Sequence, residues 1–262
     1  MPDVHRLCLM NLMLHGIESP IALGDSLGPQ GASLPKADVI LTNPPFGTAR
    51  GGHTRRDDFT YPTNNRQLAF LQHIYRGLKP GGRAAVVLPD NVLFEDNTGR
   101  KIRTDLMHKC NLHTVLRLPT GIFYAQGVKT NVLFFQRGET DKDNTKETWF
   151  YDLRTNMPNF GKRTPFTRDH FIEFEKAYGD RPNGNSKRTD QGEEGRFRCF
   201  SREDLVQRND NLDITWLRDE NADHAEDLPE PEVLAAQIME NLGIAMQEME
   251  ELSTMLEGGE AE

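Results

Sequence analysis

Residues 37–46 read Ala-Asp-Val-Ile-Leu-Thr-Asn-Pro-Pro-Phe. The apolar run at residues 39–41 predicts a short buried strand, which stops at Asn43. The two prolines that follow lack backbone N–H groups, and each forces the residue before it out of the helical region. We therefore predict a rigid corner that leaves the sheet extended and ends at Phe46. The carboxyl end of a strand is where open α/β sheets bind their ligands.

The corner Asn43-Pro44-Pro45-Phe46 suits the transfer of a group to an aromatic amine. Such an amine is a poor nucleophile, because its lone pair is delocalised into the ring. The Asn43 amide oxygen and the Pro44 carbonyl can accept hydrogen bonds from it and favour positive charge on the attacking nitrogen, while Phe46 offers a flat face for stacking. A plain strand-ending turn is the alternative, since Asn-Pro is a common turn dipeptide. The motif resembles the Asn-Pro-Pro-aromatic signature of amino-methyltransferases that use S-adenosylmethionine.

The residues after the corner predict an α/β fold. An amphipathic helix is expected at 67–78, ended by Lys-Pro-Gly-Gly at 79–82, and a buried strand follows at 83–88. This order forms one crossover unit, so the strands around Val39 and Val86 should be parallel neighbours. The remaining sequence predicts a helix at 99–110, strands at 114–118 and 130–136, and an edge strand at 149–153.

The N-terminal segment predicts a helix at 4–16, ended by Gly16, and then a short strand at 21–25 that ends in Gly24 and Asp25. Asp25 has two interpretations, which stay open here. In methyltransferase-like sheets an acid at this place can accept a hydrogen bond from the adenine amine of the cofactor. It can equally cap the following turn together with Ser26.

Composition indicates a globular protein of 262 residues whose acidity is confined to its tail. Residues 210–262 hold 16 acidic side chains and one basic, so residues 1–209 carry 30 basic and 24 acidic groups, a net +6 against −9 overall. A mildly basic body permits contact with a phosphate backbone. The cysteines (Cys8, Cys110 and Cys199) have no metal or redox spacing, and no stretch reaches transmembrane length, so a reducing cytoplasm is the simplest location.

Residues 167–204 predict short helices joined by polar loops. Thr167 should cap a helix that runs to Tyr178, residues 179–195 should form a flexible loop, and Ser201 with Asp204 forms a capping box.

The glycine-bearing stretch at 47–65 beside the corner is expected either to meet phosphates through its basic groups or to be a solvated loop.

The last helix carries apolar residues at heptad spacing, over about three repeats: Ala235, Ile238, Leu242, Ala245, Met249, Leu252 and Leu256. One narrow stripe on an acidic helix favours an intermolecular coiled coil or bundle over docking on the chain's own domain. The expected domains are a partial catalytic domain at 1–160, a peripheral α/loop segment at 161–218, an acidic linker at 219–231 and the heptad helix at 232–257.

Together these stretches resemble the methylation subunit of type I restriction–modification systems, an adenine-N6 DNA methyltransferase. The match covers roughly residues 5–155 in the family's order, and its motifs are at 10–17, 24–25, 41–47, 79–82 and 118–135. The last of these includes Val-Lys-Thr-Asn-Val-Leu-Phe-Phe at 128–135. The resemblance implies an incomplete Rossmann-like, S-adenosylmethionine-dependent methyltransferase sheet with a C-terminal helical extension.

The resemblance also implies a site and partners. A target adenine would be flipped out of the duplex, its N6 amine held by Asn43 and the Pro44 carbonyl, with Phe46 on one face and Phe123 as a weaker candidate for the other. Asp25 and Gly24 would contact the cofactor, and neither a metal nor a general base is required. The partners would be DNA, a specificity subunit joined through the tail helix, and a second methylation subunit; a restriction subunit stays open.

The sequence departs from this family at its start. Such subunits have a long N-terminal helical region, a first strand with a glycine-rich loop, and a second strand ending in an acid. None of these precedes residue 37 here, so we expect the C-terminal part of a longer methylase, with an open apolar strand edge and poor cofactor affinity. The alternatives are a methyltransferase acting on protein glutamine or ribosomal RNA guanine, or a non-catalytic remnant that docks through its tail.

Overall fold

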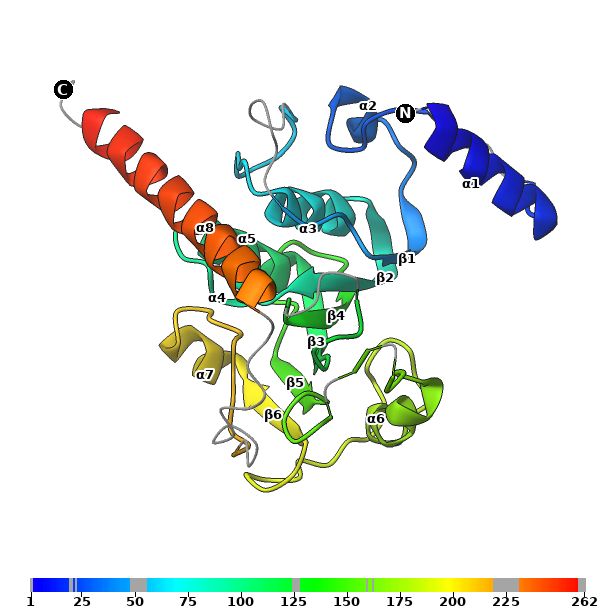
Figure 1. The fold of residues 1–262 in the computed structure, drawn as a ribbon, viewed down its shortest axis with the longest axis vertical. Coiled ribbons are helices and arrows are strands. Elements are labelled where there is room, and N and C mark those ends of the chain that lie inside the picture. The colour runs from blue at the N-terminus through cyan, green and yellow to red at the C-terminus, as the bar shows by residue number, and fades with distance from the viewer. Residues whose placement is uncertain are drawn as a thin grey trace.

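The computed structural model describes residues 2–18, 21, 23–47, 56–123, 128–158, 160–161, 163–218 and 231–258. Figure 1 shows its elements, which are, in chain order, α1 (Pro2–Leu14), α2 (Pro29–Ala32), β1 (Ala37–Thr42), α3 (Arg66–Arg76), β2 (Leu78–Pro89), α4 (Asn91–Phe94), α5 (Thr98–Lys109), β3 (Cys110–Arg117), β4 (Thr130–Arg137), β5 (Glu147–Asp152), the 3-10 helix η1 (Arg168–Phe171), α6 (Ile172–Tyr178), β6 (Phe197–Ser201), α7 (Arg202–Gln207) and α8 (Pro231–Gly258).

The strands form one mixed sheet in the order β1-β2-β4-β3-β5-β6. β1 and β2 are parallel, with Thr42 opposite Val86, so the predicted crossover unit is confirmed. β3 and β5 are also parallel, and the other neighbouring pairs are antiparallel. Helices and this mixed sheet make up an α/β fold, as expected from the alternation of elements.

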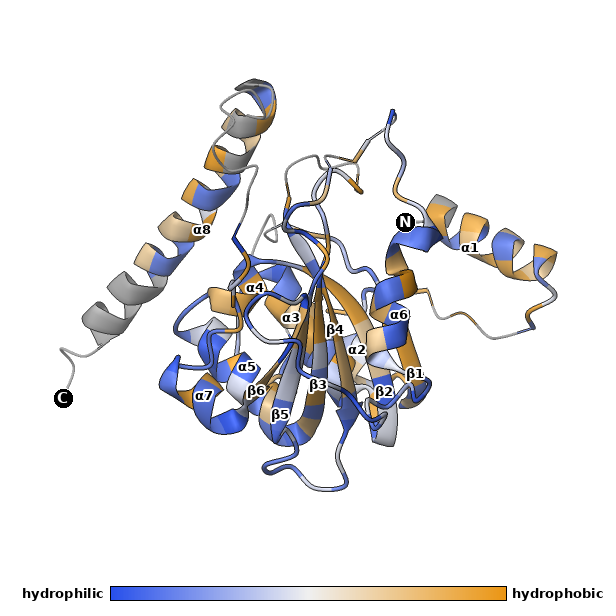
Figure 2. Cartoon of the chain, turned by 90° about the horizontal axis from the view of Figure 1, so that it is seen from below, coloured by the Kyte–Doolittle hydropathy of each residue, from blue (hydrophilic) through white to orange (hydrophobic). Residues whose placement is uncertain are grey.

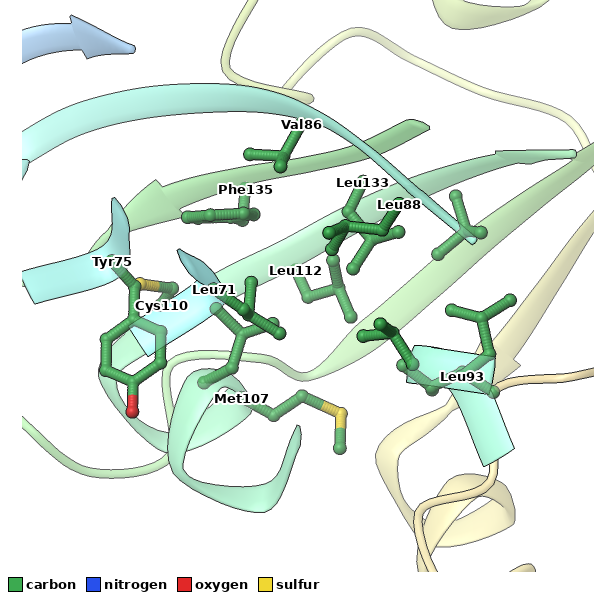
Figure 3. Packing of buried hydrophobic residues seen from close by; sticks show 14 of the residues in the cluster. Leu71, Tyr75, Val86, Leu88, Leu93, Met107, Cys110, Leu112, Leu133 and Phe135 are labelled. Atoms are coloured by element: carbon green, nitrogen blue, oxygen red, sulfur yellow. The ribbon is translucent and has the colours of Figure 1, made fainter. Parts of the chain in front are cut away.

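Two hydrophobic clusters hold the sheet between layers of helices. Side chains of α3, α4 and α5 pack on one face of β2, β3 and β4, where Val86, Leu112 and Phe135 are fully buried (Figure 3). On the opposite face α6 packs over β4, with the rings of Phe134 and Phe174 5.9 Å apart (Figure 2). Alternate residues of β4 therefore point into different clusters, as the two-residue period of a strand requires.

The expected open edge of the sheet is confirmed for the described strands. β1 has β2 as its single neighbour among them. On β1, Val39 and Leu41 are 42% and 76% exposed, although the run 39–41 is as apolar as a buried strand. The expectation that this strand is buried is therefore wrong for one face: Ile40 packs against the main cluster, but Val39 and Leu41 on the other face are exposed.

The strand expected at 21–25 is not formed: of its described residues, 21 and 23–25, none lies in a strand. A strand needs a hydrogen-bonded neighbour, and this segment has no described one. The chain turns here instead, because the Asp25 carboxylate and carbonyl accept the backbone N–H groups of Leu27 and Gly28 at 3.0 Å each.

The strand around Trp149 is not an edge strand, which corrects a second expectation. β6 pairs with β5 on its outer side, with Trp149 opposite Cys199, and the rings of Trp149 and Phe197 lie 4.8 Å apart. The segment 161–218, expected as helices and loops, thus also supplies a strand to the sheet. The signal was the aromatic run Phe-Arg-Cys-Phe at 197–200, which stands alone after a long polar stretch.

The expected helix ends are confirmed where short-range chemistry specifies them. After α1, Ile17 N donates to Leu12 O at 2.9 Å and Gly16 N to Met13 O at 3.1 Å, with Gly16 at φ +65°. This is the Schellman pattern, in which a left-handed residue turns the chain out of the helix. Ser201 caps α7 by accepting from Asp204 N at 3.1 Å, and the Asp204 carboxylate accepts from Ser201 N at 2.9 Å.

The loop at 79–82 is a bulge at the start of β2. Ala37 pairs with Leu78 but Val39 pairs with Arg83, so the intervening residues leave the ladder. Gly82 is required there because a Cβ would lie 2.9 Å from the Ala37 carbonyl oxygen.

The linker expected at 219–231 lies almost wholly outside the described residues. No helix within the described ranges is long and apolar enough to cross a membrane.

Candidate functional site

The corner lies at the carboxyl end of β1, where the parallel strands β1 and β2 both end. Asn43 and Pro45 are exposed, Pro44 is buried and Phe46 is half-buried. The carboxamide most suited to hold an amine is thus open to a ligand, while the buried Pro44 anchors the turn. A site in this position matches the general rule for ligands of parallel strands.

The corner is followed by Gly47, whose backbone is held by the first turn of α3. Gly47 has φ +102° and open space where a side chain would be. The Gln67 side chain is 3% exposed, and in the amide orientation that satisfies its neighbours it pairs with both backbone groups of Gly47. Its oxygen then accepts from Gly47 N at 2.8 Å, and its nitrogen donates to Gly47 O at 3.3 Å and to the Asn65 carboxamide oxygen.

Gln67 belongs to a chain of buried polar groups. Asn65 caps α3 by accepting from the backbone N–H groups of Gln67 at 3.0 Å and Leu68 at 3.3 Å. Its own nitrogen donates to Glu95 Oε2 at 2.8 Å, which also accepts from Asn91 at 3.3 Å. This network joins the segment after β1 to the segment after β2, so the two ends of the parallel strands are held together.

A second polar network lies at the same edge of the sheet. The Arg154 guanidinium donates to both oxygens of Asp90 at 2.7 and 2.9 Å, and Asn131 donates to Asp90 at 2.7 Å. Arg154 also donates to the carbonyls of Leu118 and Thr130, each at 2.9 Å. A bidentate pair of this kind is geometrically specific. It ties the chain after β5 to the ends of β2, β3 and β4.

Burial opposes ionisation of Asp90, but hydrogen bonds and charge from Arg154, with the hydrogen bond from Asn131, outweigh it. They hold the pKa of the Asp90 carboxyl below its ordinary value. Asp90 is thus a structural carboxylate at neutral pH and is engaged by its partners.

The cofactor candidates Gly24 and Asp25 are exposed. Asp25 Oδ1 accepts from Leu27 N at 3.0 Å, so the turn-capping interpretation is confirmed. A carboxylate has further acceptor capacity, and contact with a cofactor amine stays a prediction for this residue.

Phe123 is half-buried and packs against the second hydrophobic cluster, which includes Leu116, Leu118 and Tyr151. A role in covering the target base therefore stays a prediction.

Of the basic residues expected in the loop at 47–65, the structure describes Arg56, and Arg66 borders the loop as the first residue of α3. Positions 48–55 lie outside the described residues. Arg56 is buried: it pairs with Asp58 at 2.6 Å and donates to Ser26 O at 2.7 Å, and its guanidinium lies 4.6 Å from the centre of the Phe59 ring. For Arg56 both the phosphate contact and the solvated loop are thus excluded, because its donors hold the chain together.

Sequence reasoning missed Gln67, Asn65 and the Asp90–Arg154 pair. Gln67 and Asn65 were hidden in the expected start of an ordinary helix, although Asn one or two residues before a helical pattern is an N-cap signal. Arg154 and Asp90 are 64 residues apart in the chain, and no local pattern links them.

Comparison with known proteins agrees with this geometry. The model of the family described as N-6 DNA Methylase matches residues 1–225. The chain is 51% identical to the EcoKI type I restriction enzyme methylase subunit of Escherichia coli (strain K12), over an alignment 286 positions long with gaps, and 50% identical to the StySPI methylase subunit of Salmonella potsdam, over 294 positions. These alignments cover 96% and 99% of this chain but 54% and 55% of those proteins, so the chain spans about half the length of the curated relatives it matches.

Solved structures agree as well. The crystal structure of the EcoKI M protein has a TM-score of 0.80 at 50% identity and covers 98% of this chain and 59% of that one. A structure described as the basis of complex assembly and conformational transition of the type I R-M system has a TM-score of 0.64 at 32% identity, covering 95% and 51%. With most of its length matched by the family model and half of its residues identical to methylase subunits, the chain belongs to the N-6 DNA methylase family.

Proposed function

We propose that this chain carries the methyl-acceptor half of a type I modification subunit, which methylates N6 of adenine in DNA. The observation that supports this most is the exposed Asn43 next to the buried Pro44 at the carboxyl end of β1. Family membership supports the same activity. The activity is proposed for the assembled enzyme, since this chain spans about half the length of the methylase subunits it matches.

The chemistry assigned to the corner is hydrogen bonding to a flipped-out base. The Asn43 carboxamide oxygen and the Pro44 carbonyl accept hydrogen bonds from the N6 amine, which localises the lone pair on nitrogen as it attacks. Phe46 stacks on the ring, and Phe123 is the candidate for the opposite face. The corner would hold N6 in line with the methyl carbon of the donor. As the nitrogen–carbon bond forms, the methyl–sulfur bond would break and the neutral thioether would leave, and the amine would then lose a proton to solvent, so positioning supplies much of the acceleration.

S-adenosylmethionine is the methyl donor in this proposal, and its sulfonium supplies the activated methyl group. The exposed Asp25 fits such a group, because a carboxylate oxygen accepts a hydrogen bond from an adenine amine, and Gly24 beside it is exposed as well. These two residues are the proposed cofactor contacts.

The proposed partners are DNA, a specificity subunit and a second methylation subunit. α8 supports a helical partner: Ile238, Leu242 and Met249 of the heptad stripe are 56%, 53% and 68% exposed. In Figure 2 α8 lies to one side of the sheet, and its Glu248 lines a pocket together with Arg100 and Thr104 of α5. An exposed apolar stripe on a long helix is the usual signature of a helix that packs against another helix. We assign this stripe to the specificity subunit.

The test is Asn43→Ala in the assembled modification enzyme, assayed by transfer of a radiolabelled methyl group to adenine. Loss of one hydrogen-bonding group at a reacting centre lowers the rate by about 10²–10³-fold, so a loss of this size is expected with subunit assembly unchanged. Asn185→Ala, at another exposed asparagine, is the matched control and should leave transfer unchanged. An Asn43→Ala enzyme that methylates at the wild-type rate would refute the assignment and favour a non-catalytic docking role.

A further inference from the structure

α3 carries two buried glutamines that each hold one backbone residue of the loop after β1. Gln72, which is fully buried, accepts from Tyr61 N at 3.1 Å and donates to Tyr61 O at 2.7 Å. Gln67 pairs with Gly47 N and O in the same two-way manner. α3 therefore makes side-chain hydrogen bonds to the backbone of the segment after the corner at two places, Gly47 and Tyr61.

The grip at Gly47 acts directly on the corner. An amide that pairs with both the N–H and the C=O of one residue replaces the two hydrogen bonds that a neighbouring strand residue would make. Gly47 needs this support more than other residues, since it lacks a side chain and lies at positive φ, where glycine has many accessible conformations. Phe46 is bonded to Gly47, so the path of its backbone depends on the same contact.

Gln67 is itself held in place on several sides. Its backbone N–H and its side-chain nitrogen both face the Asn65 carboxamide oxygen, and Asn65 is anchored to Glu95 at 2.8 Å. A buried polar chain of this kind is rigid when its members are paired, and removing one member leaves its neighbours unsatisfied. The position of Gly47 is therefore set by a network that reaches the segment after β2.

We propose that Gln67 is a positioning residue for methyl transfer. It fixes the backbone of Gly47 and so holds the Phe46 ring and the Asn43 carboxamide in the geometry that receives the target base. The role rests on the proposed function and deepens it, because it identifies what keeps the acceptor corner in place. Gln72 makes the same kind of contact at the far end of the loop, 14 residues after Gly47, and provides the matched control.

The experiment compares Gln67→Ala, Gln67→Glu and Gln72→Ala in the assembled modification enzyme. Single-turnover transfer is measured with enzyme in excess over DNA and with saturating S-adenosylmethionine, and amide hydrogen exchange is followed in the peptide that contains Gly47. A small misplacement at a reacting centre slows chemistry by up to about 10²-fold. We expect Gln67→Ala to slow transfer by about 10–10²-fold, with unchanged cofactor affinity and faster exchange at Gly47.

Gln67→Glu keeps the size of the side chain but cannot donate to Gly47 O or to Asn65, so it should be impaired like Gln67→Ala. Gln72→Ala should lower the melting temperature as much as Gln67→Ala and leave the transfer rate within about two-fold, because its partner lies far along the loop from the corner. Equal loss of rate in Gln67→Ala and Gln72→Ala would overturn the proposal and reduce Gln67 to a stabilising residue. Wild-type rates in Gln67→Ala, where Asn43→Ala abolishes transfer, would overturn this role and leave the proposed function standing.

The failure of the proposed function has a different pattern. If Asn43→Ala transfers as well as wild type, the acceptor corner is not the site, whatever Gln67 does. Hydrogen exchange tests the contact between Gln67 and Gly47 separately from its effect on methyl transfer. If amide exchange at Gly47 is unchanged in Gln67→Ala, the contact itself is contradicted, whatever the transfer rate.

Discussion

Acidification should destabilise this protein through His113, a histidine of β3 that is buried and has no carboxylate partner among the described residues. Its side chain is 4% exposed, its Nδ1 lies 3.0 Å from Thr114 Oγ1, and its ring lies edge-on to Tyr178 at 6.0 Å. Burial, and then the positive charge of Arg188, lower the pKa of His113 from 6.5 to about 3. The folded protein thus keeps this imidazole neutral at pH values where the unfolded chain protonates it.

The sign and size follow from that difference. Below pH 6.5 the unfolded state binds a proton that the folded state does not, so the contribution of His113 is complete above pH 6.5 and is lost as the pH falls toward about 3. One pH unit corresponds to about 1.36 kcal/mol. Between pH 6.5 and pH 5 the free energy of unfolding should therefore fall by about 2 kcal/mol through this residue alone.

The assay is urea unfolding of wild type and of His113→Gln at pH 7 and pH 5. The substitution removes the titrating group, and the other histidines are common to both proteins, so the difference in pH dependence isolates His113. Wild type should lose about 2 kcal/mol more than the variant over this interval. Equal pH dependence in wild type and His113→Gln would refute the reasoning.

Three further predictions concern stability and assembly. Arg154→Met should lower the free energy of unfolding by about 1.5–3 kcal/mol in chemical denaturation, because it removes the charge-assisted hydrogen bonds to the half-buried Asp90 carboxylate and leaves Asn131 donating to it. Recovery of most of this loss in the double variant with Asp90→Asn is expected, and its absence would argue against the pair. Ser201→Ala should cost about 1 kcal/mol in the same assay by removing the cap of α7, and no change would mean that the cap is replaced by solvent. Leu242→Lys should leave thermal unfolding nearly unchanged, since this side chain is half exposed, yet abolish association with the specificity subunit in sedimentation or pull-down; retained association would contradict the role of α8.

Elements specified by neighbouring residues were predictable. The corner after β1, the Gly16 helix end and the Ser201–Asp204 box each depend on contacts within a few residues. The crossover to β2 joins residues 44 apart, such as Thr42 and Val86, and was predictable from the order strand, helix, strand. Backbone restriction by proline, capping by short polar side chains and apolar periodicity act locally, so the residue order carries them. The family and its acceptor motif became visible for the same reason, because the motif is contiguous.

Contacts between distant segments decided the rest. β6 joins β5 because Phe197 packs on Trp149, 48 residues earlier, and the segment at 21–25 stays out of the sheet because no described strand lies beside it. Pairing of strands and of buried ions depends on which surfaces meet in space, and this information is spread over the whole chain.

The acceptor site shows both kinds of information in one place. The sequence by itself determined the Asn43–Phe46 corner, since prolines restrict their own and the preceding residues. Only the tertiary structure decided that Gln67 of α3 would hold Gly47 and that Arg154 would hold Asp90. The physical reason is that a hydrogen bond requires its two groups to approach within about 3 Å, and for residues far apart in the chain that approach exists only once the sheet and its helices have packed.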